Sequence, residues 1–285
     1  MATRVEELAA QIRVYQREYY TGEATISDAE FDLLWDELRR LDPGNALFQE
    51  VGDDLVDGYP KRRHVMPMGS QDKAADPEAF LKWTLKVNHD RYIVQFKMDG
   101  ASMELQYREG RFEYGVTRGD GIVGDDITVN VRKMQGVPQV ADSFTGAVRG
   151  EVLLSRTAHR DKYQDKANTR NAANGLMKRK DGVGVEDLQL ICYDAVETTN
   201  PGFFASERAK LEWLSANGFT AVPYREFTDA EQIIAYRAEI STLRDLDPGA
   251  LDALDYDIDG LVVKGDTIDP VDMARPRPEK QIAFK

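Results

Sequence analysis

The sequence predicts an α+β protein in which a small N-terminal helical hairpin precedes a larger domain of antiparallel sheets with flanking helices. Two patterns support this prediction. Apolar residues recur at helical spacing before residue 42, whereas short segments of alternating apolar and polar residues recur after residue 90. A polar stretch at residues 51–63 separates the two regions and is expected to be a linker. We therefore place a domain boundary at residue 58, between domains 1–58 and 59–285.

The N-terminal hairpin is expected from two capping boxes. Thr3 and Glu6 form the first, and Ser27 and Glu30 form the second. Each box is followed by apolar residues three and four apart, and the second helix is expected to end at the Asp-Pro-Gly sequence of residues 42–44. The connection between the helices is short enough for two antiparallel neighbours.

The larger domain is expected to alternate strands with a few helices. Strands are predicted at residues 91–96, 101–107, 112–116, 147–154, 189–195 and 259–264, and helices at 76–87, 206–217 and 230–243. The strand at 101–107 shows the clearest alternation, with Met103, Leu105 and Tyr107 on one face. Short strands joined by tight turns favour antiparallel pairing.

The composition limits the classes of protein to which the chain can belong. The net charge of −13 argues against binding nucleic acid with the whole surface, because phosphate binding needs dense Lys and Arg. The single Cys192 forms no disulfide within the chain, and the three histidines lack paired metal-ligand spacing, so no zinc site is expected. No segment has the ~18 apolar residues of a membrane span, and the N-terminus lacks a signal peptide. We expect a cytoplasmic monomer with no membrane contact.

Five short motifs, far apart in the sequence, carry the polar residues that would be needed for covalent chemistry on a lysine. They lie at residues 97–100, 117–121, 149–152, 257–264 and 282–285. A lysine amine is a poor nucleophile at its ordinary pKa of about 10.4. The apolar neighbours of Lys97 and three cations, Arg118, Lys264 and Lys285, are expected to make it neutral near pH 7. A lysine at the mouth of a hairpin is the alternative, since Lys-x-Asp-Gly also suits a turn.

In this order the motifs resemble those of the nucleotidyltransferase superfamily of DNA ligases, RNA ligases and capping enzymes, most closely the NAD-dependent DNA ligases. The resemblance implies a nucleotidyltransferase (ATP-grasp-like) domain at residues 59–285. There Lys97 attacks the α-phosphate of NAD, forms a lysine–AMP intermediate and releases nicotinamide mononucleotide, the first step of nick sealing. The implied catalytic residues are Lys97, Asp99, Lys264 and Lys285, and Glu151 and Asp259 would hold Mg²⁺.

The N-terminal hairpin resembles the module that holds nicotinamide mononucleotide in the NAD-dependent ligases and that ATP-using relatives lack. The implied residues for binding NAD are Tyr19, Tyr20, Asp28, Phe31, Asp32, Ser70, Gln71, Gln95, Arg118, Glu151, Lys264 and Lys285. Tyr19 and Phe31 also lie on apolar stripes and could simply pack in the hairpin core. Asp28 and Asp32 fall one turn apart on a single helix face.

A further block at residues 168–175 resembles a family segment and implies that Arg170, Lys178 and Arg179 face nicked double-stranded DNA. The oligonucleotide-binding fold, zinc module, helix-hairpin-helix and BRCT segments that complete such ligases do not follow Lys285. We therefore expect DNA to be bound in large part through segments outside this chain.

Three residues depart from the usual family pattern. Gln95 stands where a glutamate usually accepts a hydrogen bond from the adenine amino group, which puts adenine selectivity in question. Phe31 replaces a tyrosine, and Gln71 replaces an apolar residue that packs on the base.

Two other functions remain open. One is an ATP- or GTP-dependent RNA ligase or capping-type nucleotidyltransferase, which release of nicotinamide mononucleotide from NAD would exclude. The other is a catalytically silent nucleotide-binding domain, which the sequence disfavours because every charged motif position except Gln95 is filled.

Overall fold

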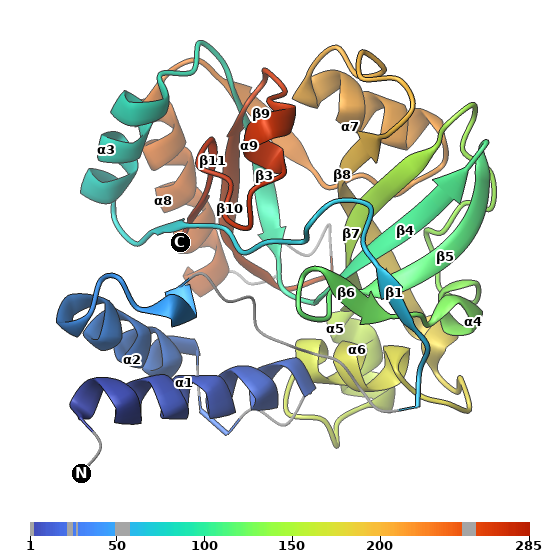
Figure 1. Ribbon diagram of the computed structural model, residues 1–285, viewed down its shortest axis with the longest axis horizontal. Helices are drawn as coiled ribbons and strands as arrows, with labels where there is room; N and C mark the ends of the chain where they lie inside the picture. The colour runs from blue at the N-terminus through green and yellow to red at the C-terminus, as the bar shows by residue number, and fades with distance from the viewer. Residues whose placement is uncertain (1–2, 22–24, 27, 49–57, 247–254) are drawn as a thin grey trace.

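The computed structural model describes residues 3–21, 25–26, 28–48, 58–246 and 255–285. It shows a helical pair beside a domain with two larger, mainly antiparallel sheets and flanking helices (Figure 1). The predicted α+β class is confirmed. No helix within the described ranges is both long and apolar enough to cross a membrane.

The N-terminal hairpin consists of α1 (Arg4–Thr21) and α2 (Asp28–Leu41), followed by a 3-10 turn at Ala46–Phe48. The first capping box is confirmed, since Thr3 N donates to Glu6 Oε2 at 2.7 Å and Glu6 N donates to Thr3 Oγ1 at 3.3 Å. The second box includes Ser27, which lies outside the described residues. The hairpin has its own apolar core, separate from that of the larger domain, at Leu8, Ala9, Ile12, Trp35, Leu38 and Leu47.

The segment after the hairpin crosses the face of the larger domain and adds two short strands to it. β1 (Lys61–Arg63) pairs antiparallel with β6 (Val123–Asp125), and β2 (Lys73–Ala74) pairs in parallel with β11 (Gln281–Phe284). The prediction of a linker as far as residue 63 is therefore wrong for residues 61–63. Three consecutive charged residues show no alternation, and their partner strand lies far along the chain.

The five-stranded sheet has the order β2-β11-β10-β3-β9. Its other strands are β3 (Tyr92–Met98), β9 (Tyr224–Phe227) and β10 (Ile258–Gly265). Two helices pack on it, α3 (Pro77–Val87) and α8 (Ala230–Leu246). The ring of Phe80 in α3 stacks on that of Phe284 in β11 with centroids 4.3 Å apart, so the C-terminal motif is fixed to the core.

The four-stranded sheet has the order β5-β4-β7-β8, with all neighbours antiparallel. Its strands are β4 (Ala101–Arg108), β5 (Arg111–Thr117), β7 (Gly146–Leu154) and β8 (Leu188–Glu197). The remaining elements are α4 (Thr128–Val131), α5 (Arg156–Lys162), α6 (Thr169–Met177), a 3-10 turn at Val185–Asp187, α7 (Glu207–Ala216) and α9 (Pro270–Met273).

The strands and helices predicted between residues 76 and 264 are confirmed to within a few residues at their ends. The sequence did not predict the short elements, among them α5, α6, β9 and β11. Segments this short show little periodicity, and their structure depends on partners elsewhere in the chain.

Candidate active site

A cavity of about 370 Å³ lies between the two larger sheets, with one wall formed by the N-terminal hairpin. The sheets contribute polar residues to its lining, and the hairpin contributes Tyr15, Phe31 and Trp35. Of the residues predicted from the sequence, the cavity is lined by Phe31, Ser70, Gln71, Gln95, Lys97, Arg118, Glu151, Arg170, Lys264 and Lys285. The fold therefore brings together the motifs of the larger domain.

Lys97 stands near the end of β3, just before the turn into β4. The backbone of this turn is held by Asp99 N, which donates to Asp257 O at 3.0 Å. A Cβ atom at Gly100 would lie 2.3 Å from Val152 O, so the glycine of the Lys-x-Asp-Gly motif is required by close packing against β7. The turn thus fixes where the lysine side chain leaves the sheet.

Asp259 lies at a bulge in β10, where the pairing with β3 shifts register between Ile258 and Leu261. Gly260 has a φ of +117°, which side-chain-bearing residues rarely adopt. The Asp259 carboxylate reaches two ammonium groups through the same oxygen, Lys97 Nζ at 2.8 Å and Lys285 Nζ at 2.9 Å. The structure therefore places Lys285 next to Lys97, with Asp259 between them.

The protonation state of Lys97 differs from the sequence expectation. Burial lowers the pKa of Lys97. The negative charges of nearby carboxylates raise it by more, so the pKa lies above its ordinary value; Asp259 has the largest effect, followed by Glu151 and Asp99. In the substrate-free protein Lys97 is a charged ammonium. The expected cation cluster is only partly present, because Arg118 and Lys264 contact other groups.

Two more carboxylates complete the surroundings of Lys97. Asp99 accepts a hydrogen bond from Arg170 Nη1 at 2.7 Å, and Glu151 accepts one from Ser102 Oγ at 3.0 Å. Burial lowers the pKa of Arg170 to about 9, so its guanidinium stays charged at neutral pH. Arg170, predicted to face DNA, has a side chain only 14% exposed and lies inside the pocket.

Because the pKa of Glu151 is raised in the folded protein, the free energy of unfolding is expected to depend on pH. Burial raises the pKa of Glu151 to about 7, although Lys97 and Ser102 act in the opposite direction. Between the ordinary pKa of 4.5 and about 7, the folded protein holds a proton that the unfolded chain releases. This stabilises the protein at low pH, and the stabilisation is lost as pH rises through 7.

Glu151→Gln keeps a neutral side chain of the same shape and removes this dependence. Its unfolding free energy relative to wild type is expected to rise by on the order of 3 kcal/mol between pH 4.5 and pH 8, at about 1.4 kcal/mol per unit of pKa shift. Chemical denaturation in metal-free buffer at both pH values measures the difference. A difference independent of pH would show that folding does not raise the pKa of Glu151.

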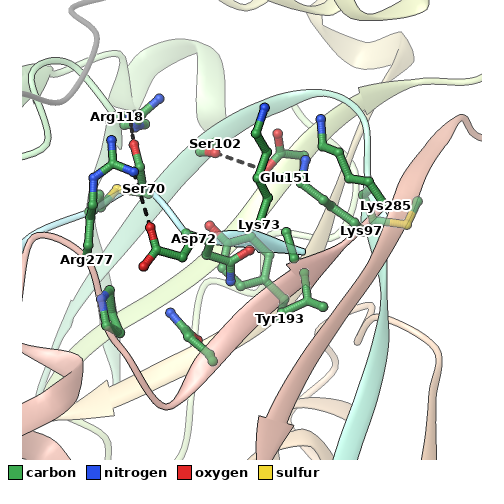
Figure 2. Close-up of a pocket in the computed structure, with 18 of the residues that line it drawn as sticks. Ser70, Asp72, Lys73, Lys97, Ser102, Arg118, Glu151, Tyr193, Arg277 and Lys285 are labelled. Carbon is green, nitrogen blue, oxygen red and sulfur yellow. Dashed lines mark hydrogen bonds and ion pairs between the residues drawn. The ribbon is translucent and has the colours of Figure 1, made fainter. Parts of the chain in front are cut away.

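Arg118 and the segment that leads into β2 line one side of the pocket (Figure 2). Arg118 Nη2 donates to Ser70 Oγ at 3.2 Å, and Arg277 Nη1 lies 3.5 Å from Asp72 Oδ1. The Arg277 guanidinium also lies 5.8 Å from the ring of Trp35 in α2. Lys73 and Arg277 also line the pocket, and the sequence analysis missed Lys73.

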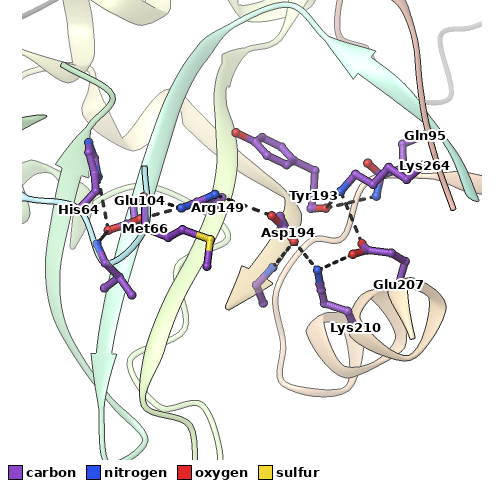
Figure 3. Close-up of polar contacts among 12 residues, drawn as sticks. His64, Met66, Gln95, Glu104, Arg149, Tyr193, Asp194, Glu207, Lys210 and Lys264 are labelled. Atoms are coloured by element: carbon purple, nitrogen blue, oxygen red, sulfur yellow. Dashed lines mark hydrogen bonds and ion pairs between the residues drawn. The ribbon is translucent and has the colours of Figure 1, made fainter. Parts of the chain in front are cut away.

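Lys264 and Gln95 lie deeper in the pocket, at a buried ionic network (Figure 3). Gln95 Nε2 and Lys264 Nζ both donate to Tyr193 O, at 3.2 Å and 3.4 Å, and Lys264 Nζ is 3.6 Å from Glu207 Oε2. Glu207 in turn contacts Lys210 Nζ at 2.8 Å. Lys264 is therefore held on the floor of the pocket.

This network continues across the four-stranded sheet to the segment before β2. Lys210 Nζ donates to Asp194 Oδ1 at 2.6 Å, and Arg149 lies between Asp194 at 4.0 Å and Glu104 at 3.6 Å. Arg149 Nη2 also donates to Met66 O at 2.6 Å. Burial lowers the pKa of Lys210, but Asp194 and Glu207 outweigh burial and keep it charged. The sequence analysis missed this network, whose members show no shared spacing.

The other predicted residues lie elsewhere or outside the described part of the structure. Arg179, just beyond α6, is exposed and paired with Asp181 at 2.7 Å, and Lys178 directly follows the same helix. The side chains of four residues predicted to hold the nicotinamide half lie outside the described residues: Tyr19, Tyr20, Asp28 and Asp32.

A pocket between antiparallel sheets, with a lysine held among carboxylates and further cations, is the arrangement of a nucleotidyltransferase domain. More narrowly, the chain belongs to the NAD-dependent DNA ligase adenylation domain family, because the sequence model of that family matches residues 57–274. This confirms the resemblance seen in the sequence.

Two curated relatives are consistent with this assignment. The chain is 49% identical to a DNA ligase of Treponema denticola, over 99% of this chain and 45% of that protein. It is 47% identical to a DNA ligase of Treponema pallidum, over 99% of this chain and 35% of that protein. The chain thus spans less than half the length of these relatives. The structure of the ATP-dependent DNA ligase from bacteriophage T7 in complex with ATP superposes with a TM-score of 0.44 at 13% identity, covering 78% of this chain and 68% of that one, which is too distant to bear on function.

Proposed function

We propose that the chain adenylates itself at Lys97 with NAD as the donor, and that this is the first step of DNA nick sealing. The observation that carries the proposal is that Lys97 and Lys285, which both line the pocket between the two sheets and the hairpin, are held by one carboxylate, Asp259. Membership of the NAD-dependent DNA ligase adenylation domain family supports NAD as the donor.

In the proposed reaction the Lys97 amine attacks the α-phosphorus of NAD. A nitrogen–phosphorus bond forms, and the bond to the phosphate oxygen of nicotinamide mononucleotide breaks. Because Lys97 starts as an ammonium, it has to lose a proton, and Asp259 Oδ2 at 2.8 Å is the acceptor at hand. Lys285 is placed to neutralise charge on the phosphate during transfer. Arg170 orients Asp99 beside them.

Mg²⁺ is part of the proposal. Among the described side chains, no group of three or more His, Cys, Asp or Glu is arranged to hold a metal. Mg²⁺ commonly uses one or two carboxylates together with substrate phosphates, and Glu151 and Asp259 fit that role. The bound ion would supply charge neutralisation for the phosphate and for the carboxylates that keep Lys97 protonated.

The hairpin is proposed to hold the nicotinamide mononucleotide half of NAD. Phe31 lines the pocket, as do Tyr15 and Trp35 of the same hairpin. Tyr19, Tyr20, Asp28 and Asp32 remain proposals from the family resemblance. Lys178 and Arg179 remain the proposed contacts to nicked DNA, and the position of Arg170 favours a role inside the pocket.

Intact mass after incubation with NAD and Mg²⁺ tests the proposed function. The protein should gain one AMP, and nicotinamide mononucleotide should appear in solution in equal amount. An adduct that forms equally well from ATP would favour the ATP-using alternative. No adduct from NAD, ATP or GTP would favour a silent nucleotide-binding domain.

Gln95→Glu should preserve or improve discrimination for adenine over hypoxanthine in the dinucleotide. Gln95 Nε2 donates to Tyr193 O, and the side-chain carbonyl oxygen of Gln95 is therefore the atom that would accept a hydrogen bond from the base. A charged hydrogen bond is worth ~1.5–3 kcal/mol, against ~0.5–1.5 kcal/mol for a neutral one. The measurement is the ratio of adenylation efficiencies with NAD and with nicotinamide hypoxanthine dinucleotide. Poorer selectivity would show that Gln95 does not face the base.

A further inference from the structure

The strand register of the five-stranded sheet places four residues in a row across the floor of the pocket. Gln95 of β3 is opposite Val262 of β10, Val262 is opposite Ala283 of β11, and Ala283 is opposite Lys73 of β2. Residues directly opposite each other on neighbouring strands lie on the same face of a sheet, and all four line the pocket. We call these four residues the floor row.

The floor row has long polar side chains at its ends and short apolar side chains in its middle. Neighbouring strands are ~4.8 Å apart, so the ends of the row are ~14 Å apart. The short side chains of Val262 and Ala283 leave room for a nucleotide above them. If the base lies at Gln95, as proposed above, the opposite end at Lys73 is the side toward the phosphates.

Lys73 also lies next to the lysines of the reacting centre. Ala283 N donates to Asp72 O at 2.8 Å, and Lys285 N donates to Ala74 O at 3.1 Å. The strand β2 therefore runs beside β11 as far as Lys285. Figure 2 shows the ammonium groups of Lys73, Lys97 and Lys285 on the same side of the pocket as Glu151. Lys97 and Lys285 are both held by Asp259, whereas Lys73 approaches from a different strand.

We propose that Lys73 binds an anionic oxygen of the NAD diphosphate and so adds a third cation to the reacting centre. This inference rests on the proposed function, because it takes a dinucleotide as the occupant of the pocket. Each phosphate of the diphosphate carries a negative charge, and in a partly buried site such charges need nearby cations. A lysine with a purely structural role would affect ligands with and without phosphate alike, whereas a phosphate-binding lysine affects mainly the ligands that carry phosphate.

The test measures binding rather than reaction, so that it is independent of self-adenylation. Lys73→Met, Lys73→Arg and the control Lys82→Met are made in a Lys97→Ala background, which blocks chemistry at Lys97. Lys82 is exposed on α3, away from the pocket lining. Calorimetry in metal-free buffer gives the dissociation constants for NAD and for adenosine, which lacks phosphate, and thermal unfolding checks the fold of each variant.

Lys73→Met is expected to weaken NAD binding about tenfold or more, the usual effect of a charge-assisted hydrogen bond, and to change adenosine binding by less than about twofold. Lys73→Arg should restore most of the NAD affinity, and Lys82→Met should change neither constant. Equal losses for NAD and adenosine, or no loss for NAD, would overturn the inference. Failure of the proposed function is seen separately, as a wild-type protein that binds NAD and Mg²⁺ but gains no AMP.

Discussion

Lys97→Ala is expected to abolish the AMP adduct that the wild-type chain forms with NAD and Mg²⁺. Removal of an enzyme's nucleophile costs on the order of 10⁶ in rate in well-studied cases, so a loss of at least about 10³-fold is expected here. The reason is geometric as well as chemical. Lys285 shares Asp259 with Lys97, but it approaches from the residue after β11 rather than from the end of β3.

The fold should survive this substitution. Asp259 keeps Lys285 as its ion-pair partner at 2.9 Å, so its carboxylate is not left without a cation. Intact mass of the variant and of wild type, incubated in parallel, measures the adduct, and Lys82→Ala on the exposed face of α3 is the matched control. A persistent adduct in the alanine variant would move the nucleophile to another residue, which peptide mapping would identify.

Removal of residues 1–57 should abolish reaction with NAD while the larger domain stays folded and still binds AMP. The hairpin has a separate apolar core, so the core of the larger domain is expected to remain intact. The cut leaves Tyr59 in place, whose hydroxyl donates to Lys178 O at 2.7 Å. It removes the wall of the pocket formed by Tyr15, Phe31 and Trp35.

The effect should be as large as that of Lys97→Ala, because the leaving group would lose its binding site while the nucleophile keeps its own. Circular dichroism and calorimetry with AMP establish that the truncated domain is folded and that its pocket is present. Intact mass after incubation with NAD and Mg²⁺ then gives the result. Undiminished adenylation by a well-folded truncated domain would refute the assignment of the hairpin to the nicotinamide half.

The helices and strands that are long enough to show periodicity could be predicted from the sequence. The strand at 101–107 alternates along its length and is β4, and the helix predicted at 76–87 is α3 behind its cap at Asp76. By contrast, β1 and β2 have two or three residues each and could not be recognised. Yet β2 is the strand that places Lys73 beside β11 and closes one end of the pocket.

The candidate site shows the same division. The resemblance of the motifs to those of the ligase family pointed to Lys97, Asp259 and Lys285. Their contacts join residues up to 162 positions apart, since Lys97 and Lys285 both reach the carboxylate of Asp259. The sequence suggested that cations would make Lys97 neutral, whereas the structure brings three carboxylates around it and keeps it protonated.

The sequence by itself determined the order of the motifs, their resemblance to a ligase family, which lysine is the candidate nucleophile, and the presence of a helical hairpin before the larger domain. These follow from local spacing and residue type, which act over a few residues and are visible in any stretch of chain. Only the tertiary structure decided that Lys285 shares Asp259 with Lys97, that Lys264 is held by Glu207, and that Arg170 lies inside the pocket on Asp99. Electrostatic partners are set by distance in space, and strand register, bulges and sheet packing determine that distance over separations that no local pattern records.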